Sequence, residues 1–210
     1  MATLGTSWAV AWMLGCAQMA SEHRVELIEL DRAIGDADHG ENIDRGFSAV
    51  AKNLSTSTYE SPAAVLKMVA TTLLSTVGGA AGPLLGTAFL RAGKAVGDGP
   101  IDSQTIVNML DAALGGIQAR GKAAEGEKTM VDAWAPAVRR AQAAADEGME
   151  PAQVLREAAE AAMEGAESSE PLVATKGRAS YLGERSAGHR DPGAQSTALI
   201  LQEAAKAAEV

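Results

Sequence analysis

The sequence is poor in cysteine and in basic side chains, and each scarcity excludes a class of protein. Cys16 is the single cysteine in 210 residues, so no disulfide can form within the chain and we expect a reducing compartment. The 18 Lys and Arg residues are outnumbered by 27 Asp and Glu residues, which gives a net charge of −9. Phosphate backbones and anionic lipid surfaces attract basic protein faces, so neither nucleic acid nor a membrane is an expected partner.

Long hydrophobic runs and a positively charged leader are also missing. No run approaches the roughly 20 apolar residues that a membrane span needs. The letters MLGCA around Cys16 faintly resemble a lipoprotein cleavage site, but no Lys or Arg precedes them, and secretory signals begin with positive charge. We therefore predict that the first residues form a helix and that the protein is cytoplasmic.

Aromatic residues make up only 3% of the chain and strand-like alternation is nearly absent, whereas alanine is abundant. Alanine has the highest helix propensity, and its small side chain lets helices approach closely. Val65, Val69, Leu73 and Val77 follow one another at four-residue steps, as on one face of a helix. The sequence thus predicts a single all-α domain over residues 1–210. The expected helices span about 6–33 (with a kink left open), 40–54, 62–77, 82–95, 103–119, 128–147, 151–168 and 192–208.

The connections between these helices are mostly short, so neighbouring helices should run antiparallel. Ser103, Thr129 and Asp191 are expected N-caps, the last with Pro192 at the first helical position. The exception is the long polar segment 169–191, which has little helical periodicity. Connections of this length in a compact domain are usually functional or disordered. Its several Lys and Arg residues are conspicuous in an acidic protein.

The letters IGDADHGENIDRGF, beginning at Ile34, concentrate carboxylates in a short stretch. Asp36 and Asp38 lie two residues apart in an expected turn or extended connection, where side chains i and i+2 point to the same side. Asp31 should reach towards them from the end of the preceding helix. Three converging carboxylates offer the hard oxygen ligands that Mg²⁺ and Ca²⁺ prefer.

The twelve-residue calcium-loop pattern does not fit this stretch. With Asp36 as its first position, Phe47 would stand where that loop requires a glutamate. Mg²⁺ in proteins takes one or two carboxylates together with waters and substrate phosphates, so a metal-bridged nucleotide is the favoured interpretation. The alternative is a solvated acidic turn with helix caps. His39 is interpreted as a hydrogen-bonding group, because Mg²⁺ prefers oxygen ligands.

Phosphate groups would also need hydrogen-bond donors and positive charge. The glycine-rich letters STVGGAAGPLLG lead into a helix and can aim backbone N–H groups at an anion, although an ordinary helix–helix turn is the alternative. The letters DPGAQS open another helix, either as a further anion site or simply as a helix start with proline. Arg178 has the planar fork that suits phosphate oxygens, and an ion pair with Glu184 is its alternative role.

Four motifs occur in order between residues 31 and 194. They read DRAIGDADHG, GGAAGP, GKAAEGEKTM and KGRASYLGERSAGHRDPGA. In these motifs the chain resembles a known family, the nucleotide-binding L subunits of bacterial dihydroxyacetone kinases. The resemblance implies an antiparallel eight-helix barrel or bundle that binds ADP or ATP at one end through two Mg²⁺ ions.

The resemblance also implies roles for individual residues. Asp31, Asp36 and Asp38 match the family's metal ligands, and Arg178 matches a catalytic cation. The implied nucleotide contacts are His39, Gly40, Glu41, Asn42, Gly79, Ala80, Ala81, Gly121, Thr129, Met130, Arg178, Asp191, Pro192 and Gly193. Ala81 stands where many relatives have serine, so a backbone N–H would have to replace the lost hydroxyl at the phosphate.

The implied reaction is phosphoryl transfer to dihydroxyacetone, or a similar small ketose, held on a separate K subunit. Bound ADP would act as a coenzyme that an M subunit of the phosphotransferase system rephosphorylates, with exchangeable ATP as the alternative. A kinase subunit for another acceptor, or a nucleotide-dependent module that reports to a transcription regulator, are further alternatives. The chain could also form a homodimer.

Overall fold

The computed structural model describes residues 3–209 and is helical within that range, apart from one antiparallel bridge between Leu4 and Ile101. The all-α prediction is confirmed. The helices are α1 (Thr6–Glu22), α2 (Arg24–Ile34), α3 (His39–Thr56), α4 (Pro62–Thr76), α5 (Ala81–Val96), α6 (Ser103–Gly121), α7 (Val131–Asp146), α8 (Pro151–Ser168), the 3₁₀ helix η1 (Arg178–Ser186) and α9 (Pro192–Ala208).

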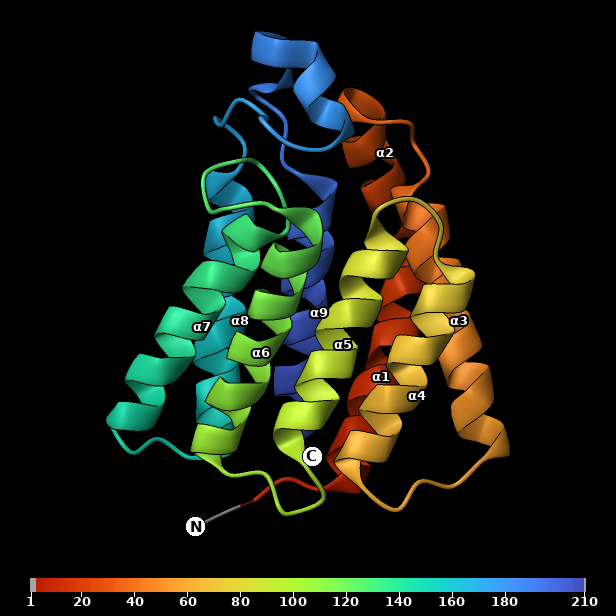
Figure 1. Ribbon diagram of the computed structural model, residues 1–210, viewed down its shortest axis with the longest axis vertical. Coiled ribbons are helices and arrows are strands. Elements are labelled where there is room, and N and C mark those ends of the chain that lie inside the picture. The colour runs from red at the N-terminus through yellow and green to blue at the C-terminus, as the bar shows by residue number, and fades with distance from the viewer. Residues whose placement is uncertain (1–2, 210) are drawn as a thin grey trace.

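The long helices pack side by side with their axes roughly aligned (Figure 1). From α3 onwards each α-helix contacts its successor in the chain, and α1 contacts both α3 and α9, so the packing order returns to its start. α2 and η1 contact each other and lie together at one end of the molecule (Figure 1). Among the helices of residues 3–209, none has both the length and the apolar character needed to span a bilayer.

Two sequence expectations about helix boundaries need correction or refinement. The expected helix 6–33 is two helices that meet at His23, whose φ of −93° and ψ of 6° leave the helical range. Ser103 is not an N-cap, because the preceding Asp102 accepts a hydrogen bond from the backbone N–H of Thr105 and so caps α6. The hydroxyl of Ser103 instead donates to the carbonyl of Met149.

Thr129 is also not the N-cap of α7. Met130 occupies that position, and the Thr129 hydroxyl accepts a hydrogen bond from the backbone N–H of Val131. α7 therefore begins at Val131, three residues after the start of the expected helix 128–147. The position of a capping residue depends on where the backbone leaves the helical conformation, which the residue type alone does not determine.

The bundle core contains a row of aromatic side chains that joins α1 to its neighbours. Trp8 stacks on Trp12 with ring centroids 5.1 Å apart, and Trp12 lies 5.7 Å from Phe89 of α5. The Trp8 and Trp12 indole N–H groups donate to the carbonyls of Ala204 and Ile200 at 3.0 and 2.8 Å. The Trp8 and Trp12 rings thus keep their polar atoms paired, which avoids the cost of an unsatisfied buried donor at these two positions.

Close helix contact depends on small residues elsewhere in the bundle. A Cβ atom built on Gly165 of α8 would lie only 2.2 Å from the Asp132 carbonyl oxygen in α7. Any side chain at this position would therefore push α7 and α8 apart.

Asp191 is the N-cap of α9, as predicted, and accepts a hydrogen bond from the backbone N–H of Ala194 at 2.7 Å. Its side chain is buried, and this burial raises the pKa of its carboxyl to about 7. The N–H groups of Ala194 and Gly193 and the Lys128 ammonium oppose the rise in pKa, while Asp132 adds to it. The helix start therefore carries a carboxyl group that titrates near neutral pH.

Replacing Trp12 by alanine should lower the free energy of unfolding by about 3–5 kcal/mol, because the change empties a fully buried ring site and removes the hydrogen bond to Ile200. Urea unfolding followed by circular dichroism measures this loss. Leu14→Ala is the matched control on the same helix: Leu14 is 46% exposed, so its loss should be below about 1 kcal/mol. Equal losses in the two variants would contradict the packing described.

Asp191→Asn should change how stability depends on pH. Between about pH 4 and pH 7 the folded protein binds more protons at Asp191 than the unfolded chain does, so this group lowers the free energy of unfolding as pH rises. Asparagine also caps helices but does not titrate. From pH 5 to pH 7 the variant should therefore gain roughly 1–2 kcal/mol relative to the wild type in urea unfolding. A difference that stays constant with pH would show that Asp191 does not titrate in this range.

Candidate functional site

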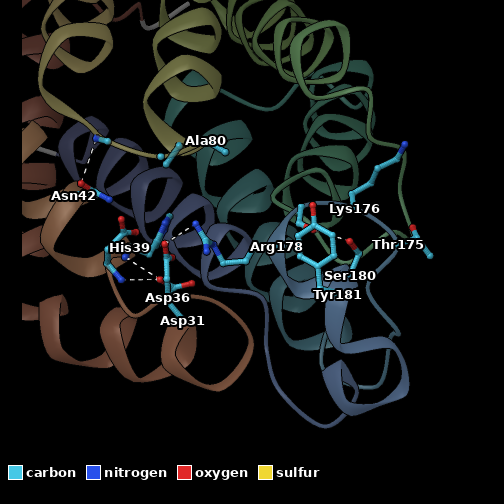
Figure 2. A pocket seen from close by; sticks show the side chains of 15 residues that line it. Asp31, Asp36, His39, Asn42, Ala80, Thr175, Lys176, Arg178, Ser180 and Tyr181 are labelled. Carbon is cyan, nitrogen blue, oxygen red and sulfur yellow. Dashed lines mark hydrogen bonds and ion pairs between the residues drawn. The ribbon is translucent and has the colours of Figure 1, made fainter.

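A cavity of about 640 Å³ is lined by residues of α2 and η1, among others (Figure 2). These two helices lie together at one end of the molecule (Figure 1). Three parts of the chain line the cavity: the end of α2 with the start of α3, the turn before α5, and the segment that leads into η1. The lining residues are Asp31, Asp36, Asp38, His39, Asn42, Gly78, Gly79, Ala80, Ala81, Thr175, Lys176, Gly177, Arg178, Ser180 and Tyr181. Residues more than 140 positions apart in sequence thus face one cavity.

The three predicted metal-ligating aspartates come together in this cavity. One carboxylate oxygen from each of Asp31, Asp36 and Asp38 lies within 4.8 Å of the other two. Asp31 projects from the last turn of α2, and its Oδ2 accepts hydrogen bonds from the backbone N–H groups of Asp38 and His39 at 2.8 and 3.1 Å. These two bonds hold the connection after α2 against the end of that helix.

The connection between α2 and α3 is a tight turn and not the extended segment that would place alternate side chains on one face. Ala37 has a φ of +63°, in the left-handed region, and Asp38 already has a helical backbone conformation. A left-handed residue other than glycine is uncommon and costs free energy, and such positions concentrate at functional sites. The convergence of Asp36 and Asp38 is therefore confirmed, but a turn at Ala37 produces it.

The acidic cluster has the ligand chemistry of a divalent-cation site. Its ligand atoms are all carboxylate oxygens, which suit a hard cation such as Mg²⁺. Asp31 is buried, whereas Asp36 and Asp38 are exposed to the cavity, which leaves room for water or a ligand to complete the coordination. The residues present therefore fit the Mg²⁺ that the sequence resemblance implied.

Arg178, the first residue of η1, reaches over the acidic cluster. Its Nη2 atom lies 2.9 Å from Oδ2 of Asp36, and Figure 2 shows its side chain pointing towards the aspartates. The alternative ion pair with Glu184 is not formed. The positive φ of Gly177, +65°, turns the chain immediately before Arg178. The Arg178 guanidinium thus lies beside the three carboxylates in the cavity.

His39 and Asn42 connect α3 to other walls of the site. The His39 ring is buried and its Nε2 lies 2.9 Å from the hydroxyl of Ser196 in α9, so it acts as a hydrogen-bonding group, as expected. Burial lowers the pKa of His39, with Asp31 and Asp38 opposing this. Asn42 Oδ1 accepts a hydrogen bond from the backbone N–H of Gly78 at 3.2 Å and thereby fixes the glycine-rich turn before α5.

A smaller cavity of about 180 Å³ adjoins the first and shares with it Asp31, His39, Ala80, Ala81, Lys176, Gly177 and Arg178. Its further walls are largely apolar. The other lining residues are Ile34, Gly35, Leu84, Lys128, Thr129, Met130, Ala179, Asp191, Pro192 and Gly193. An apolar compartment beside a charged one can hold a ligand with a flat apolar ring and an anionic tail.

Most of the residues expected to contact a nucleotide line one of these two cavities, but three do not. A Cβ atom on Gly40 would lie 2.2 Å from the carbonyl oxygen of Arg24, so this glycine lets α3 approach α2. Glu41 forms an ion pair with Arg24 outside the cavities. Gly121 ends α6 and lies beyond both cavities.

Sequence reasoning missed several residues of the site. Lys176 lines both cavities, and Thr175, Ser180 and Tyr181 line the larger one. A signal for Lys176 was present, because basic residues are concentrated in segment 169–191 of an acidic chain. Lys128 lies inside the motif GKAAEGEKTM, but nothing in the local pattern distinguishes a buried lysine from an exposed one.

Residues 33–206 match the family model described as the DAK2 domain. The chain is 42% identical over 199 residues to the ADP-binding subunit DhaL of PEP-dependent dihydroxyacetone kinase 1 from Listeria innocua, with 95% of each chain covered. It is 40% identical over 208 residues to the ADP-binding subunit DhaL of the Escherichia coli PEP-dependent dihydroxyacetone kinase, with 99% of each covered.

Among solved structures, the dihydroxyacetone kinase of C. freundii in its native form matches with a TM-score of 0.73 and 26% identity. The match covers 94% of this chain but 34% of that one, so this chain spans about a third of the length of the solved kinase. The family resemblance carried by the four sequence motifs is thus confirmed. The chain belongs to the DAK2 domain family.

Proposed function

We propose that this chain is the nucleotide-binding subunit of a dihydroxyacetone kinase, which binds ADP or ATP with Mg²⁺ and transfers a phosphoryl group to dihydroxyacetone held on a separate K subunit. The convergence of Asp31, Asp36 and Asp38 opposite Arg178 carries this proposal. The cavity volume of about 640 Å³ lies within the range of small-molecule sites. Similarity over nearly the full length to two ADP-binding subunits supports the same function.

The two adjoining cavities suggest how the nucleotide lies. The base fits the smaller cavity, where Leu84 and Met130 offer apolar contacts, and the phosphates fit the larger cavity near the aspartates. Phosphates and carboxylates repel one another, so a cation must lie between them. Asp31, Asp36 and Asp38 would hold the two Mg²⁺ ions that the family resemblance implies. When bound, Mg²⁺ supplies Lewis-acid stabilisation of the charge on phosphoryl oxygens.

The chain's own residues would bind and orient the phosphates. α5 begins at Ala81, and the backbone N–H groups of a first helical turn have no partner within the helix, so they can donate to an anion. This role compensates for the missing hydroxyl at Ala81. Arg178 can pass from Asp36 to a phosphoryl oxygen, where its fixed positive charge would stabilise the transition state.

In this proposal the present chain binds the nucleotide, and a separate K subunit binds dihydroxyacetone, the phosphoryl acceptor. The chain has nearly the length of the ADP-binding subunits to which it is similar, and about a third of the length of the solved kinase. We further propose that bound ADP stays in place as a coenzyme, which an M subunit of the phosphotransferase system rephosphorylates. The relatives' description as PEP-dependent kinases supports this donor over free ATP.

Asp36→Ala should abolish the binding of Mg-ADP while the helical content stays unchanged. Losing an outer-shell partner alone typically reduces metal affinity about 10–100-fold, so loss of a ligand should cost roughly 100-fold or more. Isothermal titration calorimetry measures the affinity, and circular dichroism checks the fold. Asp98→Ala is the control, because Asp98 is exposed in the connection after α5 and lines neither cavity of the site. Unchanged affinity in Asp36→Ala would refute the metal assignment.

Reconstitution tests the division of labour and the donor together. The purified chain with Mg-ATP and dihydroxyacetone should give no dihydroxyacetone phosphate, and adding a K subunit, an M subunit and a PEP-driven phosphotransferase system should start turnover. Product from the chain alone would contradict a separate acceptor subunit. Turnover with K subunit and ATP, but none with the PEP-driven system, would contradict ADP as a bound coenzyme.

A further inference from the structure

The segment 169–191 carries Arg178 and Lys176 to the site but has little apolar support of its own. Its buried apolar residues, Ala174 and Ala179, form a small cluster with Ile34 of α2 that is separate from the main core. Figure 1 shows the segment at the end of the bundle, next to α2. Regions with few buried apolar contacts open more easily than the core around them. Polar contacts must therefore fix where Arg178 lies.

Lys128 makes the contacts that join the two ends of this segment. Its Nζ donates to the carbonyl oxygens of Ser169 at 2.7 Å and Glu170 at 3.1 Å, which begin the segment, and to that of His189 near its end. An ammonium group has three donors, and here each donor has a backbone acceptor. One side chain thus links three carbonyl groups that are up to 20 positions apart.

Two features of Lys128 lower the stability of the fold: its charge is buried, and its backbone is in a left-handed conformation. The side chain is only 1% exposed, and no carboxylate among residues 3–209 forms an ion pair with it, so its charge is stabilised by carbonyl dipoles and by the more distant Asp191, Glu170 and Asp132. Its φ of +62° lies in the left-handed region, which is uncommon for lysine. An apolar side chain could fill the same space without burying a charge, so filling space does not account for a lysine.

Further bonds connect the neighbours of Lys128 to both the segment and the site. The backbone N–H of Thr175 donates to the Glu127 carbonyl at 3.3 Å, and the backbone N–H of Asp191 donates to the Ser169 hydroxyl at 3.0 Å. Met130, two residues after Lys128, lines the smaller cavity. Lys128 therefore lies where the wall of the smaller cavity meets the base of the segment that carries Arg178.

We propose that Lys128 is a positioning residue, which clamps both ends of segment 169–191 through three backbone carbonyls and so holds Arg178 over the aspartate cluster. Its effect on the nucleotide rests on the proposed function above. Its effect on the segment does not, because the three hydrogen bonds exist without any ligand. The two effects can therefore be measured separately.

Lys128→Met should loosen the segment while the bundle stays folded, because methionine keeps the length and apolar character of the side chain but donates no hydrogen bonds. Trypsin cleavage after Lys176, Arg178 and Arg185 should accelerate roughly tenfold or more under native conditions, in line with the loss of charged hydrogen bonds. Lys122→Met is the matched control. Lys122 lies in the same connection and also has a positive φ, +52°, but it is exposed, so its variant should be cleaved at the wild-type rate.

The same variants are titrated with Mg-ADP. Lys128→Met should bind Mg-ADP roughly 10–100-fold more weakly than the wild type, the loss typical of residues that orient a site through hydrogen bonds, and Lys122→Met should bind normally. Unchanged cleavage, or faster cleavage with unchanged Mg-ADP affinity, would overturn the positioning role. If the wild type itself binds no Mg-ADP, the proposed function fails, and the cleavage rates alone still decide whether Lys128 clamps the segment.

Chemical rescue of a different variant, Lys128→Ala, is a second test, which can be used if Lys128→Met does not fold. Lys128→Ala removes the side chain beyond Cβ, and propylammonium ion has the size and charge of the missing part. Protection of the segment from trypsin should return with propylammonium chloride and not with sodium chloride at equal concentration. Equal results with the two salts would show that the ammonium group is not what holds the segment.

Discussion

Repulsion among three carboxylates is the constraint around which this end of the molecule is organised. Asp31, Asp36 and Asp38 bring oxygens within 4.8 Å of one another, where like charges disfavour a compact arrangement. The backbone N–H groups of Asp38 and His39 offset part of this cost by donating to Asp31, and Arg178 adds a positive charge beside Asp36. A bound divalent cation would remove most of the remaining repulsion. A cation bound at this cluster is therefore part of the proposed function.

The helical bundle provides the rigidity that such a cluster needs. Apart from the segment around Arg178, the walls of the site begin or end α-helices: α2 supplies Asp31, α3 begins at His39, α5 begins at Ala81, and α9 begins after Asp191. Buried packing holds the bundle together, including the contact of Phe89 in α5 with Trp12 in α1 and the hydrogen bond from Trp12 to Ile200 in α9. Helix termini also leave backbone N–H groups without partners, so the bundle offers anion donors at the place where the cavity lies.

The wall that contains Arg178, segment 169–191, is not part of a long α-helix and is held in place mainly by hydrogen bonds. Segment 169–191 depends on hydrogen bonds to backbone carbonyls, to which Lys128 contributes three, and on a small apolar cluster at Ile34. The apolar cluster of this segment is separate from the main core, whereas Asp31 belongs to α2, which packs against α3.

The sequence by itself determined the all-helical class, most helix positions and the candidate aspartates, because helical periodicity and charge spacing are local properties. Local patterns did not determine the left-handed turn at Ala37, the caps at Asp102 and Met130, or the break at His23, since these depend on backbone conformation. Only the tertiary structure placed Arg178 on Asp36 and buried Lys128 among carbonyls of a segment more than 40 residues away. The physical reason is that burial and pairing of a charge depend on residues that are distant in the chain, and no spacing in the sequence encodes that distance.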